Sequence, residues 1–119
     1  MTRADLRLIA SLIPECSRVL DLGCGNGELL RLLEGRGCHG TGVEIEPELF
    51  LAALRHGVNV IDLDINSQLD QFADGAYDVV VLSRTLQNLR QPAEVLREMT
   101  RIASHGIVSM PNFVHWRNR

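Results

Sequence analysis

The chain has 119 residues, 45% of them hydrophobic and 23% charged, and a formal net charge of −3. This length and composition predict a single folded domain over 1–119 with a core of its own. Positive and negative residues are interspersed, so we expect no basic face for a nucleic-acid backbone. No apolar run approaches the ~18 residues of a membrane span, and Asp5 and Arg7 interrupt the region where a signal peptide would be apolar. We therefore expect a cytoplasmic protein with no membrane partner.

Helical and strand patterns alternate along the whole chain. In chain order we expect a helix over 6–13, a strand over 19–22, a helix over 29–33, a strand over 41–45, a helix over 47–55, a strand over 58–63, a loop or short helix over 66–75, a strand over 77–83, a helix over 91–102 and a strand over 106–110. The run Val79–Leu82 has no polar alternation, which is typical of a strand covered on both faces. The pattern predicts a Rossmann-like, doubly wound α/β fold with a mostly parallel sheet.

The most informative segment is the turn between the first strand and the second helix. Gly23, Gly25 and Gly27 alternate there, so that the backbone can turn sharply and a ligand can approach it closely. Asp21 precedes the turn, where a carboxylate would repel a pyrophosphate but would suit an ammonium group. S-adenosylmethionine (SAM) fits this charge better than NAD. Cys24 lies inside the turn, where a small side chain is all that the turn requires.

Further acids follow the next two strands. Glu44, followed by Ile45, ends the second strand, where an acid in this architecture can accept both hydroxyls of a ribose. Asp64 with Ile65 follows the third strand and could supply an acceptor for the exocyclic amine of adenine and an apolar neighbour for its ring, with Asp62 as the alternative acceptor. Carboxyl ends of parallel strands share one edge of a sheet, so we expect a common crevice.

The end of the fourth strand completes the predicted crevice. Ser83 and the residues up to 87 would lie beneath the methionine part of the cofactor. The four histidines fall on predicted turns or on the tail, so none is a convincing general base. The three cysteines have spacings that match no zinc or redox motif, and we expect reduced structural thiols and no metal site.

Several motifs together resemble those of class I SAM-dependent methyltransferases, and within that class the MetW family. They comprise Val19–Gly27, Gly42–Ile45, Gly57–Ile61, Asp64, Tyr77–Val81, Leu82–Ser83, Thr85–Gln87, Glu94–Met99, Gly106–Ser109, Pro111–Phe113 and His115–Arg117, with Arg3–Leu6 near the start. The resemblance covers nearly the whole chain. It implies SAM or S-adenosylhomocysteine (SAH) as the cofactor, a role in methionine biosynthesis, and a homoserine O-acyltransferase as the partner.

The chain departs from this pattern in two ways. Leu63 stands where relatives often carry a glycine, which leaves the choice between Asp62 and Asp64 open. The usual fold has further strands after the fifth, and we expect the sheet here to stop at that strand. Its outer edge, with Ile107, Val108 and Met110, would then be unprotected and could support self-association, unless the tail folds back with Trp116 as its cover.

Three functional hypotheses follow from the sequence. The first is a SAM-binding protein that supports the homoserine acyltransferase step. The second is an active methyltransferase for an unidentified small molecule, which needs no general base if it aligns donor and acceptor. The third is a module that binds no ligand and in which the glycine turn serves only the fold.

Overall fold

The computed structural model describes residues 2–83, 89–109 and 114–117. Its elements in chain order are α1 (Arg3–Leu12), β1 (Arg18–Leu22), α2 (Glu28–Glu34), β2 (His39–Val43), α3 (Pro47–Arg55), β3 (Val60–Ile61), the 3₁₀ helix η1 (Leu69–Gln71), β4 (Tyr77–Leu82), α4 (Pro92–Ile102), β5 (Ala103–Val108) and β6 (Val114–Arg117). Within these ranges, no helix has the length and apolar character needed to cross a membrane.

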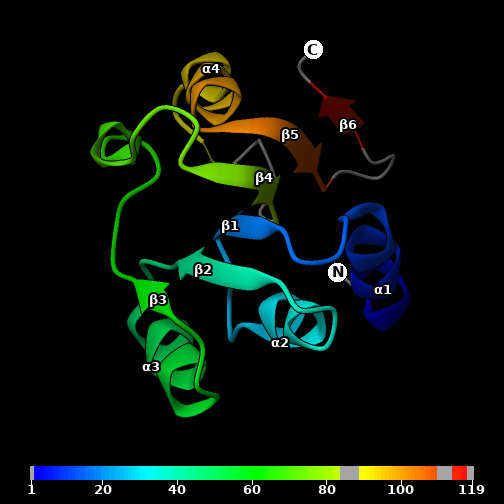
Figure 1. Cartoon of the computed structure of the whole chain (residues 1–119). Coiled ribbons are helices and arrows are strands. Elements are labelled where there is room, and N and C mark those ends of the chain that lie inside the picture. Colours follow the sequence, from blue (N-terminus) through cyan, green and yellow to red (C-terminus); the bar gives the residue numbers. More distant parts are fainter. Residues whose placement is uncertain (1, 84–88, 110–113, 118–119) are drawn as a thin grey trace.

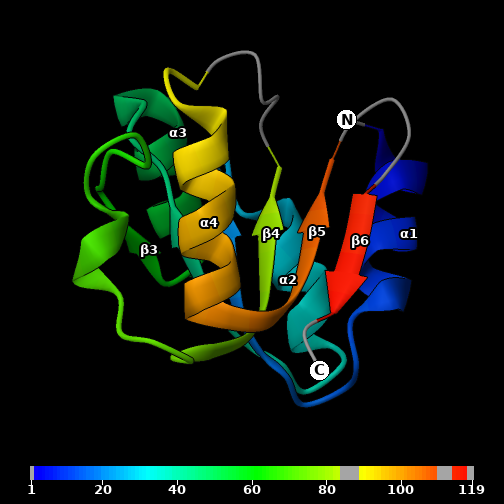
Figure 2. The same ribbon diagram turned by 90° about the horizontal axis from the view of Figure 1, so that it is seen from above.

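The described strands form one sheet in the order β3-β2-β1-β4-β5-β6 (Figure 1). β1 to β5 run parallel, and β6 runs antiparallel to β5, as the opposed arrows in Figure 2 show. The strand order reverses between β1 and β4, and at such a switch point the loops leaving the two strands diverge. The predicted doubly wound α/β fold with a mostly parallel sheet is confirmed.

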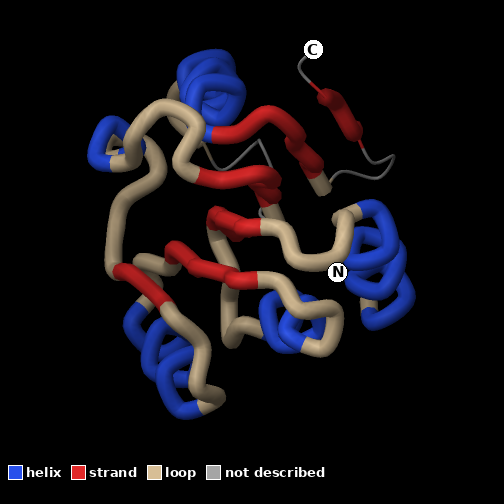
Figure 3. Tube along the Cα trace, viewed as in Figure 1, coloured by secondary structure: helices blue, strands red, loops and turns tan. Residues whose placement is uncertain are grey.

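Helices cover both faces of the sheet (Figure 3). Alternate strand residues such as Val19 and Val79 pack against α1, α2 and α3 in one core cluster. The intervening residues, such as Leu20 and Val80, pack against α4 and the η1 segment in the other. The strands at the centre of the sheet are therefore buried on both faces, as their unbroken apolar runs predict. Asp21 is two residues after Val19 in β1, so its side chain lies on the same face of the sheet, the face that α1 and α2 cover.

Three strands differ from their predicted limits by two residues or more at one or both ends. β2 begins at His39 and includes Gly40 and Gly42. A Cβ at Gly40 would lie 2.6 Å from Leu30 on α2, so the strand packs closely on that helix at a residue without a side chain. β3 contains only two residues, Val60 and Ile61, which pair with Gly42 and Val43 of β2. β5 begins at residue 103, directly after α4, although its first residues have weak strand propensity.

The prediction that the sheet stops at its fifth strand, leaving that edge open, is wrong. β6 pairs with β5 along Val108↔Val114 and Gly106↔Trp116, and the Ile107 and Val108 side chains are buried in the two core clusters. The Trp116 ring lies against Gly106, where a Cβ would be 2.2 Å from it, so the alternative in which Trp116 covers the edge holds. The predicted self-association through the β5 edge loses its physical basis. Met110 lies outside the described residues.

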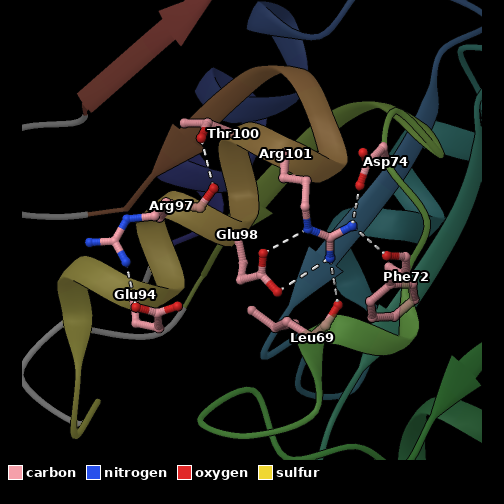
Figure 4. Close-up of polar contacts among 8 residues, drawn as sticks. All are labelled: Leu69, Phe72, Asp74, Glu94, Arg97, Glu98, Thr100 and Arg101. Atoms are coloured by element: carbon pink, nitrogen blue, oxygen red, sulfur yellow. Dashed lines mark hydrogen bonds and ion pairs between the residues drawn. The ribbon is translucent and has the colours of Figure 1, made fainter.

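One arginine fixes the packing of α4 against η1 (Figure 4). The Arg101 guanidinium donates to the backbone oxygens of Leu69 and Phe72 at 3.0 and 2.7 Å, and to the carboxylates of Glu98 and Asp74 at 2.7 and 2.8 Å. These contacts raise the pKa of Arg101 above its usual value, Glu98 contributing most. Arg101 thus neutralises the charge of the two carboxylates and hydrogen-bonds two backbone carbonyl groups at the short helix.

Candidate functional site

The glycine turn is attached to the end of β2 by backbone hydrogen bonds. The N–H groups of Gly23 and Cys24 both donate to the Val43 carbonyl, at 2.8 and 3.0 Å. Gly23, Gly25 and Gly27 have φ values of 76°, 60° and 86°, which explains why glycine recurs at alternate positions. The turn is thus held at the carboxyl edge of the sheet, beside the switch point.

Gly27 has a packing role that the sequence does not reveal. A Cβ there would lie 2.3 Å from Val58 Cγ2, whereas a Cβ at Gly25 would meet nothing within 4 Å. Two cavities lie at this edge of the sheet. Gly25 lines one of them, and Gly27 lines neither. The predicted contact between Gly27 and a ligand therefore has no support in the geometry, and its absent side chain lets the turn pack on the segment before β3.

Glu44 connects the end of β2 to the turn. Its side chain is buried, with 3% exposed, and its Oε1 accepts from the Gly25 N–H at 2.8 Å. Its Oε2 accepts from the Glu46 N–H at 3.1 Å. Each carboxylate oxygen has more than one acceptor position, so Glu44 can hold the turn and still accept from a ligand hydroxyl.

Asp21 is the most deeply buried acid of the site, with 1% of its surface exposed. The Ser83 hydroxyl donates to its Oδ1 at 2.5 Å. Burial raises the pKa of Asp21 to about 7, the Ser83 hydrogen bond opposes this shift, and the charge of Glu44 adds to it. The geometry thus joins the ends of β1 and β4 through Asp21 and Ser83.

Asp64 and Asp62 occupy different environments. Asp64 is half-buried and lines a cavity, its Oδ1 accepts from the Asn66 N–H at 2.9 Å, and its Oδ2 lies 3.6 Å from the Arg90 guanidinium. Asp62 is exposed and lines neither cavity. Of the two alternatives left open by the sequence, only Asp64 therefore faces the crevice.

The predicted residues surround two adjoining cavities that share Gly23. The first, the Glu44 cavity, measures about 190 Å³ and includes Gly23, Glu44, Ile45, Asp64 and Ile65 in its lining. The second, the Asp21 cavity, measures about 290 Å³ and includes Asp21, Gly23, Cys24, Gly25 and Ser83. Together they have the size of a small-molecule site and not of a void in the core. Residues 84–87, also predicted to lie beneath the cofactor, are outside the described part of the chain.

Sequence reasoning missed some residues of the site. Leu6 of α1 and Leu49 of α3 line the Asp21 cavity, although their spacing indicates only core positions. Leu89 closes the Glu44 cavity from beyond the fourth strand. Asn26 and Glu28 lie in or just after the turn, and their proximity to Gly25 was a usable signal. Helix packing and not local pattern brings the leucines to the site.

Other features of the sheet lie away from this edge. A larger, open cavity of about 690 Å³ lies at the amino edge, among Arg18, His39 and Tyr77, and contains none of the predicted residues. His105 lies in β5, where its ring contacts that of His115 in β6, and His39 begins β2, so the prediction that His39 and His105 lie on turns is wrong. Among the described residues that line the two site cavities there is no histidine.

Fold and site define a Rossmann-like domain of the class I SAM-dependent methyltransferase type. A solved SAM-dependent methyltransferase from Archaeoglobus fulgidus is 28% identical, with a TM-score of 0.75, and the match covers 88% of this chain and 48% of that one. A ubiquinone biosynthesis O-methyltransferase from Xanthomonas oryzae is 30% identical over 95 residues, which are 76% of this chain and 40% of that protein.

The particular family follows from a more specific match. Residues 3–119 match the family described as methionine biosynthesis protein MetW, and the chain belongs to this family. A bifunctional methionine biosynthesis protein MetXA/MetW from Rhodopirellula baltica is 42% identical over 93% of this chain, which covers 19% of that protein. The chain thus spans about half the length of the Archaeoglobus fulgidus structure, and less than half the length of the Xanthomonas oryzae and Rhodopirellula baltica proteins.

Proposed function

We propose that this chain binds SAM or SAH at the carboxyl edge of its sheet and acts in methionine biosynthesis, in the cytoplasm, alongside a homoserine O-acyltransferase. The observation that carries the binding proposal is the pair of buried carboxylates, Asp21 and Glu44, on either side of Gly23. Among the described residues lining the two cavities there is no lysine or arginine. Such a site favours a ligand that brings cationic groups and hydroxyls, and disfavours a pyrophosphate.

The two cavities suit the two halves of this ligand. Glu44 would accept from the ribose hydroxyls, while Asp64 would accept from the adenine amine and Ile65 would contact the adenine ring. Asp21 would face the ammonium group of the methionine part, with Ser83 beside it. Gly23, Gly25 and Cys24 would line the passage between the halves, where glycines leave the backbone open to the ligand.

The partner proposal rests on a relative and on family membership. In the Rhodopirellula baltica protein, one chain carries both names, MetXA and MetW. A function that two parts share within one polypeptide can also be shared by two associating polypeptides. Co-purification of the tagged chain with the homoserine O-acyltransferase of its own organism would support this proposal, and a failure to associate at micromolar concentrations, with and without SAM, would contradict it.

A second candidate function is methyl transfer to a small molecule. The similarity to an O-methyltransferase of ubiquinone biosynthesis favours it. Displacement at a sulfonium requires alignment of donor and acceptor more than it requires a base, so the lack of a histidine in the cavities does not oppose it. Release of SAH that depends on an added acceptor would support this function, and no release across a metabolite panel would favour the binding role alone.

Binding itself is tested by titration calorimetry with SAM and SAH. We expect micromolar affinity for the wild-type chain, and a loss of about 10- to 100-fold for Glu44→Ala, which removes charged hydrogen-bond acceptors. Glu48→Ala is the matched control, because Glu48 is an exposed acid in the first turn of α3. No heat and no rise in Tm with excess SAM would contradict the proposal and favour a module without a ligand.

A further inference from the structure

Asp21 is a buried acid beside which the described part of the chain places no cation. Its one recorded hydrogen bond within the described chain comes from the Ser83 hydroxyl, which is neutral. The side chain nevertheless lines a cavity of about 290 Å³ and is not sealed within the core. This combination differs from that of Asp78, the other aspartate within a described strand, whose carboxylate is paired with Arg18 at 3.0 Å.

The groups that surround Asp21 do not favour a negative charge on it. Glu44, from the end of β2, is buried and adds a repulsive charge. Glu28, at the start of α2, lines the same cavity, and its own ion pair with Arg3 is exposed and 3.9 Å long. Among the described residues, the other elements that line the cavity contribute Cys24 from the turn, Leu6 from α1 and Leu49 from α3, and none of these carries a positive charge. Without a ligand, protonation of Asp21 relieves this repulsion.

We propose that Asp21 exchanges a proton for the ligand's ammonium group, so that each SAM or SAH that enters the Asp21 cavity releases a proton from the Asp21–Ser83 pair to solvent. This inference rests on the proposed function, since it assumes SAM as the ligand. The exchange balances: the protonated carboxyl and the ammonium-bearing ligand give a carboxylate–ammonium pair and one free proton. No covalent bond to the ligand forms or breaks.

The exchange makes Asp21 a pH-dependent specificity residue. Burial holds the pKa of Asp21 at about 7, so the acid is largely protonated at pH 6, and the ammonium must compete with that proton. A ligand that has the adenosine part but no ammonium group does not compete with it. Methylthioadenosine is such a ligand, and its affinity should be the same across this range. The site therefore discriminates SAM from methylthioadenosine better at neutral than at acidic pH.

The test is calorimetry of the full chain with SAM at pH 5.5, 6.5 and 7.5, in two buffers of different ionisation enthalpy. We expect close to one proton released at pH 5.5, and a Kd that tightens about tenfold from pH 5.5 to pH 6.5 and less beyond it. Methylthioadenosine should release no proton. SAM binding with the same Kd at all three pH values and no proton release would overturn this inference and leave the proposed function intact, whereas no binding at any pH would overturn the proposed function.

Two variants assign the effect to the Asp21–Ser83 pair. Asp21→Asn cannot exchange a proton, so its weaker SAM binding should be independent of pH. Ser83→Ala keeps the acid but removes the hydrogen bond that lowers its pKa, so the pH dependence should persist and move to higher pH. Glu48→Gln, in an exposed acid, should leave the proton release of the wild-type chain unchanged. Proton release that persists in Asp21→Asn would contradict the assignment.

Discussion

Two clusters of charged side chains in this molecule are built in opposite ways. At the α4–η1 contact, the guanidinium of Arg101 is shared by two carboxylates and two carbonyls (Figure 4). At the carboxyl edge, Asp21 is more deeply buried, and among the described residues its carboxylate accepts from the neutral Ser83 hydroxyl and not from a cation. The first arrangement is complete in the folded chain, whereas under our proposal Asp21 gains a cationic partner only when the ligand binds. A buried charge therefore indicates a binding site, and not a contact within the fold, only when the protein itself supplies no group of opposite charge beside it.

The largest expected effect is a gain in stability when the unpaired acid is neutralised. Because the pKa of Asp21 is raised to about 7, the folded chain retains a proton that the unfolded chain has lost above about pH 4. The free energy of unfolding therefore falls as the pH rises from about 4 to 7. Asp21→Asn removes this loss, and at pH 8 should raise the free energy of unfolding by up to about 4 kcal/mol, measured by urea denaturation without ligand.

Asp78→Asn is the control for that experiment, because the comparison predicts the opposite sign. The hydrogen bond from the Arg18 side chain lowers the pKa of Asp78, so its contribution to stability is present at neutral pH and is lost as the pH falls through that lowered pKa. Asp78→Asn should thus destabilise the chain slightly at pH 8. A destabilising Asp21→Asn at pH 8 would contradict the contrast between an unpaired and a paired acid.

The next effect concerns the turn that holds the buried acids in place. Gly27→Ala places a Cβ at positive φ and 2.3 Å from Val58, and it should cost about 3 kcal/mol of unfolding free energy. Gly57→Ala has a similar φ of 77° but open space around the new Cβ, and it should cost about 1 kcal/mol. Equal losses in thermal denaturation would show that backbone conformation alone, and not contact with Val58, requires Gly27.

The third effect separates the completed cluster from the site. Arg101→Ala leaves the Leu69 and Phe72 carbonyls and two carboxylates without their donor, and it should lower the free energy of unfolding by about 2 kcal/mol. Affinity for SAM, measured at a temperature where the variant is folded, should be unchanged. A loss of affinity comparable to that of Glu44→Ala would show that the two clusters are coupled.

The positions of residues at the carboxyl edge were more predictable from the sequence than the periphery of the fold. Asp21, Glu44 and Ser83 could be placed together because parallel strands end at one edge, and this follows from the alternation of helices and strands. The role of Gly27 could not be predicted, since it depends on Val58 from a distant segment. β6 is only four residues long, although Val114 and Trp116 alternate as in a strand, and the packing of Trp116 on Gly106 cannot be inferred from either segment alone.

The smallest expected effect comes from an ion pair close to Arg101 in Figure 4. Arg97 and Glu94 approach closely on α4, but their side chains are 68% and 55% exposed. Water and salt screen such a pair, so Arg97→Ala should change the free energy of unfolding by less than about 0.5 kcal/mol in urea denaturation. Arg101→Ala serves as the reference, because both arginines are on α4 and each contacts a glutamate three residues earlier. If Arg97→Ala lowered the free energy of unfolding as much as Arg101→Ala, ion pairing as such would stabilise this helix. The number of groups that the cation hydrogen-bonds would then not decide its contribution. The distinction between a complete and an incomplete cluster would then lose its energetic basis.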